Sequence, residues 1–389
     1  MKKIVYLLLV LLFFLDVYGT HNYSGMLLVL YMLIWHTFEF LKIKSPEFVL
    51  ILFGTTYLIF ASFNVEIRVS TIYEFALLPL VIYKTGKLSI GFFRTEKNII
   101  LFLSLSLVAL SFLFLYSILS TYLTEGMLSL SSRTAEIKFY SRSEEDLGLG
   151  GTLVGLHIVP LMSFMPLYFF QRTGELTKYF FVGSFVTFLA IMVTSLVATR
   201  SPIVILSILL LINFYYGFKK VKNSGKAVMI VLFFAIIYSV SVFDFANFEL
   251  TSFLYERMVS DDLSEAGSRT ERWMEGINNI FEYPLGGESI RIGHFHNLWL
   301  DLRYVGGVFP MIFLIILSLY FTYSCWSVIN SLLFSIQMKA FLGSVYLSLF
   351  LMMFMEPVIQ GSFVFFMYYI FFGGVLTSLK DIKPNGAIF

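Results

Sequence analysis

Apolar residues dominate the chain in long runs, and short polar segments separate the runs. A helix of about 17–25 apolar residues crosses the ~30 Å hydrocarbon core of a bilayer, so we expect each such run to span a membrane. Two longer polar segments, residues 120–151 and 244–306, interrupt the series. The pattern predicts an all-α polytopic membrane protein with about twelve spans, at residues 4–18, 24–41, 47–63, 69–83, 99–119, 152–170, 179–198, 202–218, 227–243, 307–325, 340–356 and 362–379.

The same pattern divides the chain into three parts. Residues 1–243 hold nine spans with the 120–151 loop, residues 244–306 form a long loop, and residues 307–389 hold the last three spans. The first run follows Met1-Lys2-Lys3 and has the length of a signal peptide. No small-residue cleavage site follows it and the next run begins at once, so we interpret it as a span.

Composition supports the membrane class. Hydrophobic residues make up 58% of the chain and charged residues only 13%, against about 25% charged residues in soluble domains. We therefore expect a lipid bilayer around the protein and no nucleic-acid partner. The single cysteine, Cys325, excludes a disulfide within the chain.

Lysine and arginine fall on different sides of the predicted spans. Basic residues in short loops favour the cytoplasm. With twelve spans, 17 of the 27 basic residues lie on the side of both termini, which we therefore assign to the cytoplasm of a bacterial inner membrane, with both long loops outside. Fifteen of those 17 are lysine, whereas nine of the ten on the outer side are arginine.

The arginine bias on the outer side needs a chemical explanation, because membrane topology requires positive charge but does not distinguish lysine from arginine. The planar guanidinium binds phosphate or carboxylate through two parallel hydrogen bonds. The outer arginines could instead pair with outer acids such as Glu144 and Asp261. The bias as a whole favours an anionic ligand on the outer face.

Arg200 stands inside an apolar tract, in "TSLVATRSPIVIL". Ser201 and Pro202 predict the N-cap and first position of a helix, so Arg200 lies just before a positively polarised helix end. A bound anion would make a cation at this place favourable. The alternative is an arginine that extends to the membrane surface.

The long loop contains a pair of arginines, in "GSRTERWMEGINNIFEYP". Ser268 and Glu271 form a capping box that predicts a helix from Ser268, and Pro284 ends it. Arg269 and Arg272 then lie in the first turn, where helix amides and two guanidinium groups would bind an oxyanion. An apolar stripe follows at helical spacing: Trp273, Ile277, Ile280 and Phe281.

Two histidines follow in "GHFHNLWLDLRYVGG". If a helix begins near His296, then His296 and Arg303 share one face. His294, with acids only at Glu288 and Asp301, gives a weak metal signal, so we predict no metal and no cofactor. We interpret His296 as a general base beside an arginine-bound anion; the alternative is an ordinary interfacial histidine.

The order of these motifs resembles the O-antigen polymerase and O-antigen ligase superfamily. The resemblance rests on "ATRSPIVIL", "SRTERW", "PLGG" and "HFHN" before a Gly-Gly span, and covers residues 150–308. It implies a GT-C-like helical fold and an undecaprenyl-diphosphate-linked glycan donor, used on the outer face without metal. It also implies that Arg200, Arg269 and Arg272 bind the diphosphate and that His296, before Asn297, is the catalytic base. Arg142, ahead of "LGLGG", resembles a further outer-loop arginine.

The resemblance leaves the acceptor open. A loop of this length is more typical of the polymerase, whose acceptor is another lipid-linked glycan and which can work with a chain-length regulator protein. The alternative is the ligase, whose acceptor is lipid A-core. A third reading, a lipid-linked glycan flippase, is disfavoured because the chain shows no internal repeat and its arginines gather at one face.

Overall fold

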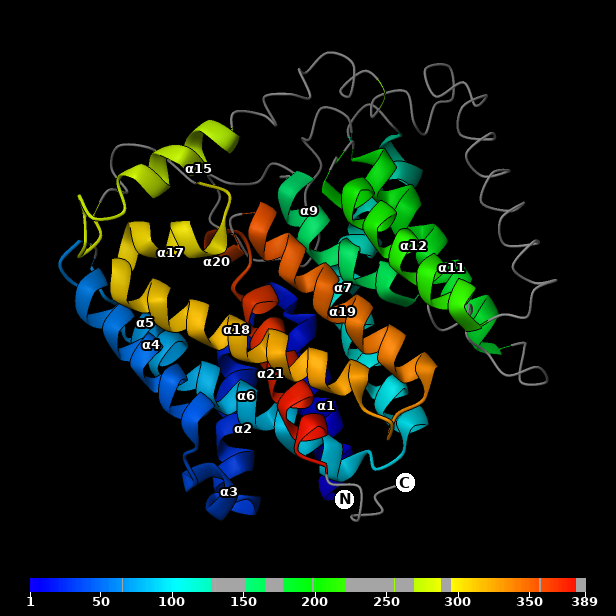
Figure 1. The fold of residues 1–389 in the computed structure, drawn as a ribbon, viewed down its shortest axis with the longest axis horizontal. Coiled ribbons are helices and arrows are strands. Elements are labelled where there is room, and N and C mark those ends of the chain that lie inside the picture. The colour runs from blue at the N-terminus through cyan, green and yellow to red at the C-terminus, as the bar shows by residue number, and fades with distance from the viewer. Residues whose placement is uncertain are drawn as a thin grey trace.

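The computed structural model describes residues 1–64, 66–126, 130, 151–164, 178–197, 199, 201–220, 255, 269–287, 295–356 and 358–382. All regular structure within these residues is helical, which confirms the all-α class (Figure 1). Several of the helices are apolar enough for a membrane-embedded protein. Five are long enough to cross a membrane: Val69–Phe92, Glu96–Glu125, Val308–Asn330, Ile336–Met355 and Phe363–Lys380.

The first half of the chain supplies helices on both sides of the bundle. Figure 1 shows the N-terminal helices packed beside α18 and α21, with α11 and α12 beyond α19. The helices of this half are α1 (Lys2–Leu15), α2 (His21–Trp35), α3 (Thr37–Leu41), α4 (Ser45–Ala61), α5 (Val69–Ile72), α6 (Leu78–Phe92), α7 (Glu96–Glu125), α9 (Gly151–Ile158), α11 (Lys178–Leu196) and α12 (Ser201–Lys220).

The second half supplies the centre of the bundle and two short helices above it. The helices described here are α15 (Arg269–Asn278), α17 (Leu298–Gly306), α18 (Val308–Asn330), α19 (Ile336–Met355), α20 (Val358–Gly361) and α21 (Phe363–Lys380). Helices α15 and α17 are too short to span a membrane and lie at one end of the bundle (Figure 1).

The core is centred on α21, which packs most extensively against α6. Nearly every residue of α21 is buried, as its predominantly apolar sequence predicts for a helix surrounded by others. Two glycines bring the two backbones together. A Cβ on Gly86 would lie 2.0 Å from the Phe371 carbonyl oxygen, and one on Gly374 would lie 2.1 Å from that of Tyr83. No residue larger than glycine fits at either position.

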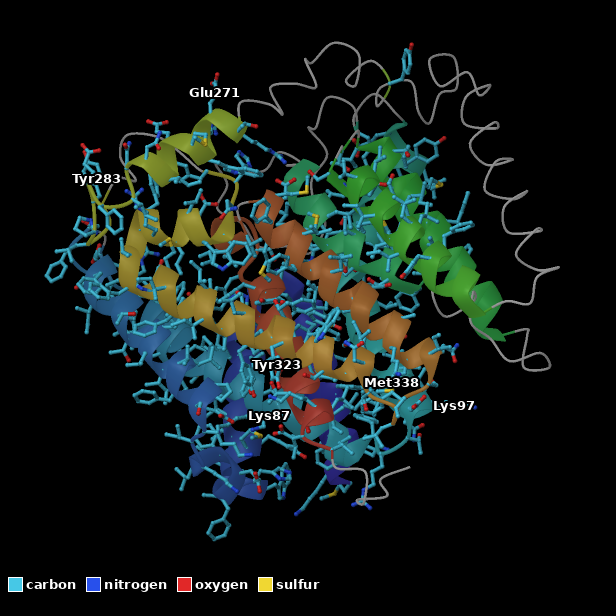
Figure 2. All side chains as sticks on the ribbon, in the orientation of Figure 1. Lys87, Lys97, Glu271, Tyr283, Tyr323 and Met338 are labelled. Carbon is cyan, nitrogen blue, oxygen red and sulfur yellow. The ribbon has the colours of Figure 1, made fainter. Side chains whose placement is uncertain are left out.

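The two ends of the bundle differ. Lys87 and Lys97 lie at the end that also carries Met338, whereas Glu271 and Tyr283 lie at the opposite end (Figure 2). We call these the lysine end and the loop end; α15 and α17 belong to the loop end. This separation agrees with the lysine and arginine pattern, while the assignment of the lysine end to the cytoplasm stays a prediction.

Most predicted spans match a helix to within six residues at each end, and four differ. The run 69–83 is too short, because the helical segment continues to Phe92. The run 24–41 is not one helix, because α2 ends at Trp35 and α3 begins at Thr37 after a break at His36. The run 152–170 is described only to Phe164, as α9 and a following 3-10 turn. The ninth span, 227–243, lies outside the described residues. The total of twelve spans therefore stays a prediction.

Candidate functional site

Helix α15 is amphipathic and lies over α17 at the loop end. Its residues Met274 and Ile277 are about half exposed, while Trp273 packs at 5.0 Å between ring centroids against Phe354 of α19. The helix begins at Arg269, as predicted, although the capping residue Ser268 lies outside the described residues. Helix α15 ends at Asn278, six residues before the Pro284 expected to end it, and turns connect the two.

The side chains at the loop end converge on Glu356, an acid that the sequence analysis did not select. Glu356 follows the last residue of α19, and only 3% of its side chain is exposed. Its Oε1 accepts a hydrogen bond of 2.6 Å from the Ser201 hydroxyl at the start of α12. Arg269 Nη2 donates to both carboxylate oxygens at 3.3 and 3.2 Å. One buried carboxylate thus joins α12, α15 and α19.

Ser201 serves this cluster through its hydroxyl. The sequence predicted that this side chain would cap α12, but the hydroxyl donates to Glu356 and accepts a long bond of 3.4 Å from Arg269 Nη1. Ser201 is the first residue of α12, and its hydroxyl proton goes to the buried carboxylate beside it, because a charged oxygen is a strong acceptor. The start of α12 is thereby tied to α15.

His296 is the third side chain that approaches Glu356, after Ser201 and Arg269. Its Nδ1 lies 3.7 Å from Glu356 Oε2, within ion-pair distance but too long for a hydrogen bond. About 26% of the side chain is exposed, so the ring is open to solvent on one side while Nδ1 faces the acid. The other ring nitrogen, Nε2, is therefore the atom available to a ligand.

The backbone at His296 is left-handed, with φ 56°. Residues other than glycine adopt this conformation at a cost of about 1–2 kcal/mol, and mostly where surrounding contacts enforce it. Asp301 provides those contacts, because its two oxygens accept from the amides on either side of His296. Phe295 N donates to Oδ1 at 2.7 Å and Asn297 N donates to Oδ2 at 3.1 Å. Asp301 thus fixes the turn that aims the histidine.

Two further contacts tie this turn to its neighbours. Trp273 Nε1 of α15 donates to the Phe295 carbonyl at 2.8 Å. Asn297 caps α17 by accepting from the Trp299 and Leu300 amides at 3.2 and 3.3 Å, and its Nδ2 donates to the Phe354 carbonyl at 3.2 Å. Asn297, which follows the predicted base, thus links the histidine turn to the end of α19 beside Glu356.

The two acids of the site have opposite electrostatic surroundings. Burial raises the pKa of Glu356, but His296, Arg269 and Ser201 lower it more, so the pKa lies below its ordinary value and the group is a carboxylate. Burial dominates at Asp301 and raises its pKa to about 6, against the lowering effects of the Phe295 and Asn297 amides and of His296. Glu356 is thus a permanent charge, whereas Asp301 titrates near neutrality.

Arg303 does not face His296, contrary to the sequence-based expectation. That expectation assumed a helix from His296, but α17 begins at Leu298 and His296 precedes it in a left-handed conformation. Arg303 is fully buried and its Nη2 donates to the Asn279 carbonyl just beyond the end of α15. A cation there stabilises the negative end of that helix, so the contact is structural.

The other predicted residues fall into two groups. Arg272 is half-buried on the next turn of α15 after Arg269. Arg200, Arg142 and His294 lie outside the described residues, so their predicted roles stay predictions. Helix α17 is buried, and it packs most extensively against α18 and α4.

The "PLGG" motif forms a turn under the loop helices. The Val308 amide donates to the Pro284 carbonyl at 2.9 Å, and the Gly287 amide donates to the Tyr304 carbonyl at 3.0 Å. Gly307 has φ 81°, and a Cβ on it would lie 2.5 Å from the Pro284 carbonyl oxygen. These contacts therefore fix the end of α17 and the start of α18 to the turns that follow α15.

An apolar groove of about 380 Å³ begins at the candidate site. We call it the outer groove. It extends from Trp273 of α15 and Asn297 along the seam between α18 and α19, past Ile315 and Phe354, to Thr322. The groove is almost wholly apolar and large enough for a small-molecule-sized portion of a ligand.

The described residues contain no group of three or more His, Cys, Asp or Glu side chains placed to hold a metal ion. The cluster around Glu356 combines a guanidinium, an imidazole and a carboxylate. These can bind an anion and transfer a proton.

Comparison of the chain with models of known protein families finds no match. A search among curated proteins likewise finds no match.

Proposed function

We propose that this protein is a membrane glycosyltransferase that polymerises cell-surface glycan repeat units carried on undecaprenyl diphosphate. The observation that supports the proposal best is the convergence of Arg269, His296 and Ser201 on Glu356 at the end of the bundle opposite the lysines. The proposal includes about twelve spans, a GT-C-like architecture and a bacterial inner membrane with the site on its outer face.

His296 has the surroundings that a general base requires. An acceptor sugar hydroxyl attacks the anomeric carbon of the donor, and its proton passes to His296 Nε2 as the new glycosidic bond forms. The bond between that carbon and the phosphate oxygen breaks, and the lipid diphosphate leaves with the electron pair. The Glu356 carboxylate beside Nδ1 stabilises the imidazolium that results, as a carboxylate does beside a catalytic histidine elsewhere.

The arginines act on the leaving group in this mechanism. Arg269 is held in place by Glu356, and Arg272 and the undescribed Arg200 supply further positive charge to the diphosphate. In this arrangement the arginines neutralise the charge of the leaving diphosphate, a task for which many transferases use a divalent ion. The outer groove runs from this point into the bundle and accommodates part of the lipid chain.

Transfer by purified protein tests the proposal. The protein in nanodiscs, given a lipid-diphosphate-linked glycan and excess chelator, should lengthen the glycan. His296→Ala should abolish the reaction, and Glu356→Gln should slow it about ten- to a hundredfold, because a charge-assisted hydrogen bond is worth about 1.5–3 kcal/mol. Glu271→Gln, an exposed acid on α15, is the matched control and should leave the rate unchanged.

The acceptor separates the alternatives. Elongation of a lipid-linked glycan supports the polymerase, and transfer only to lipid A-core supports the ligase. No transfer to either acceptor, or full activity in both His296→Ala and Glu356→Gln, would contradict the proposed mechanism.

A further inference from the structure

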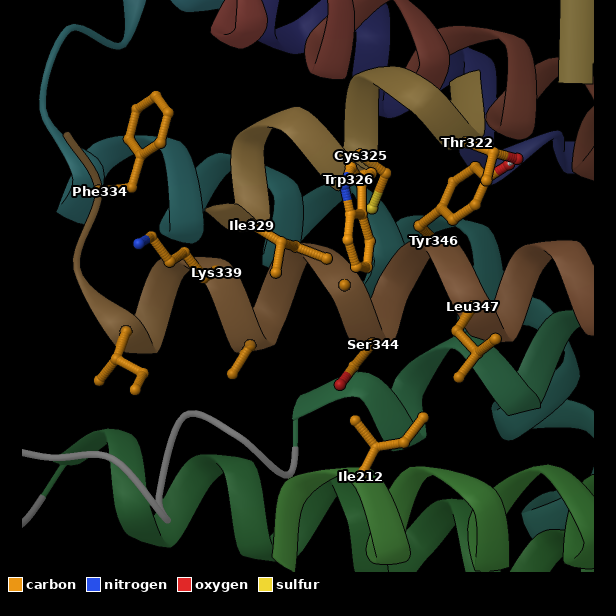
Figure 3. Close-up of a pocket in the computed structure, with 13 residues that line it drawn as sticks. Ile212, Thr322, Cys325, Trp326, Ile329, Phe334, Lys339, Ser344, Tyr346 and Leu347 are labelled. Carbon is orange, nitrogen blue, oxygen red and sulfur yellow. Dashed lines mark hydrogen bonds between the residues drawn. The ribbon is translucent and has the colours of Figure 1, made fainter. Parts of the chain in front are cut away.

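A second cavity lies along the same helix seam, toward the lysine end. It has a volume of about 510 Å³ and we call it the inner cavity. Its walls come from Ile212 of α12, from Trp326 and Ile329 of α18, and from Gly343 and Tyr346 of α19 (Figure 3). The lining is apolar except for a few groups, so the cavity is suited to a hydrocarbon chain.

One charged side chain, Lys339, lines the inner cavity. Figure 3 shows it between Phe334 and Ile329, at the end of the cavity away from Thr322. Lys339 is half-buried, and its ammonium makes no hydrogen bond or ion pair with any described residue. The carboxylate of Glu96, near the start of α19, accepts from the Ser335 amide at 2.8 Å and does not line the cavity.

We propose that the inner cavity binds an acyl chain of an anionic phospholipid whose phosphate lies at Lys339. A membrane phospholipid joins a hydrocarbon chain to a phosphate, which are the two chemistries that the cavity presents together. A lysine between helices at the lipid headgroup level attracts an anionic headgroup, and each such residue contributes about fivefold in preference. This proposal does not rest on the proposed function.

The seam gives the bound lipid a connection to the candidate site. Thr322 lines both the inner cavity and the outer groove, and its hydroxyl lies 2.6 Å from that of Tyr346. The inner cavity and the far end of the outer groove therefore meet at Thr322. A lipid seated at Lys339 supports the wall of the groove that leads to Trp273 and Asn297.

Quenching of tryptophan fluorescence tests the proposal directly, because Trp326 lines the cavity and is 66% exposed. The full chain carrying Trp35→Phe, Trp273→Phe and Trp299→Phe retains Trp326 alone. It is reconstituted in phosphatidylcholine bilayers with a small fraction of brominated phosphatidylglycerol, or with the same fraction of brominated phosphatidylcholine. We expect the anionic lipid to quench Trp326 well beyond its share of the bilayer, and the zwitterionic lipid to quench in proportion to its share.

Two variants separate headgroup from chain. Lys339→Gln should lower the preference for brominated phosphatidylglycerol about fivefold. Gly343→Leu keeps Lys339 but fills the cavity, since a Cβ there already lies 3.1 Å from the Ile329 side chain, and should also abolish the preferential quenching. Lys2→Gln, an exposed lysine at the same end of the bundle, is the matched control and should behave as the parent.

Three outcomes would overturn the proposal. Equal quenching by both brominated lipids would show that the cavity does not select an anionic headgroup. Unchanged preference in Lys339→Gln would remove the lysine from the site. Unchanged preference in Gly343→Leu would place the lipid outside the cavity.

Discussion

At the residue scale, the candidate site depends on two buried acids with different tasks. Glu356 carries a fixed negative charge that orders Arg269 and His296. Asp301 accepts two backbone amides and thereby holds His296 in its left-handed conformation. Glu356 acts through its charge, whereas Asp301 acts through the geometry of its hydrogen bonds. Because the pKa of Glu356 is lowered and that of Asp301 is raised, a change in pH affects the two acids differently.

Asp301 should give the protein a measurable pH-dependent stability. Its folded pKa of about 6 lies above the unfolded value of about 3.9, so its stabilising contribution is complete below about pH 4 and is lost as pH rises through about 6. Asp301→Asn cannot ionise. The difference in Tm between this variant and the wild type, measured in detergent micelles, should therefore shift in favour of the variant as pH rises from about 4 to about 7.

The exposed acid Glu271 provides the control for this measurement. The Tm difference between Glu271→Gln and the wild type should stay nearly constant over the same pH range. A constant difference for Asp301→Asn as well would mean that Asp301 does not titrate in this window.

The sequence indicated some of these residues and could not indicate others. It selected Arg269 and His296 because charge and motif are local properties. Glu356 carried the same kind of signal as Arg200, a lone charge in a long apolar tract, and that signal could have selected it. The task of Asp301 depends on the backbone angle at His296, which the spacing of residues does not determine.

At the element scale, α15 is a short amphipathic helix that three side-chain contacts fix to the bundle. Arg269 binds Glu356, Trp273 donates to the Phe295 carbonyl, and Arg303 donates to the Asn279 carbonyl. The sequence predicted this helix, because periodicity is a local property, but it placed Ile280 and Phe281 in the apolar stripe although the helix ends at Asn278. It could not predict that Arg303 would bind the far end of the helix rather than a ligand, since that contact joins residues from different elements.

Trp273→Phe isolates the middle contact. Phenylalanine keeps an aromatic ring against Phe354 but cannot donate a hydrogen bond to Phe295, so the histidine turn loses one restraint. Because this hydrogen bond is worth about 1 kcal/mol, its loss should lower the rate of glycan transfer by purified protein roughly fivefold. Met274→Leu, an exposed apolar change on the same helix, should not alter the rate. Equal rates for all three proteins would show that this contact does not position the site.

At the scale of the whole molecule, we expect the lysine end and the loop end to face opposite sides of a membrane. This prediction can be checked by thiol labelling, because the one native cysteine, Cys325, is buried. In a Cys325→Ala background, Glu271→Cys should react in intact cells with a membrane-impermeant maleimide. Lys97→Cys, exposed at the lysine end, should react only after the membrane is permeabilised. The reverse pattern would invert the proposed orientation, and reaction of both in intact cells would contradict it.

The glycine contact between α6 and α21 has a consequence for how the protein is made. Gly86 enters the membrane early in synthesis, whereas its partner surface around Phe371 and Gly374 is among the last of the described helices to leave the ribosome. Until α21 arrives, the space that it fills at the centre of the bundle has no occupant from this chain. We therefore expect the bundle to reach its final packing only when translation is nearly complete, and a chain that ends before α21 to leave the glycine face of α6 without its partner.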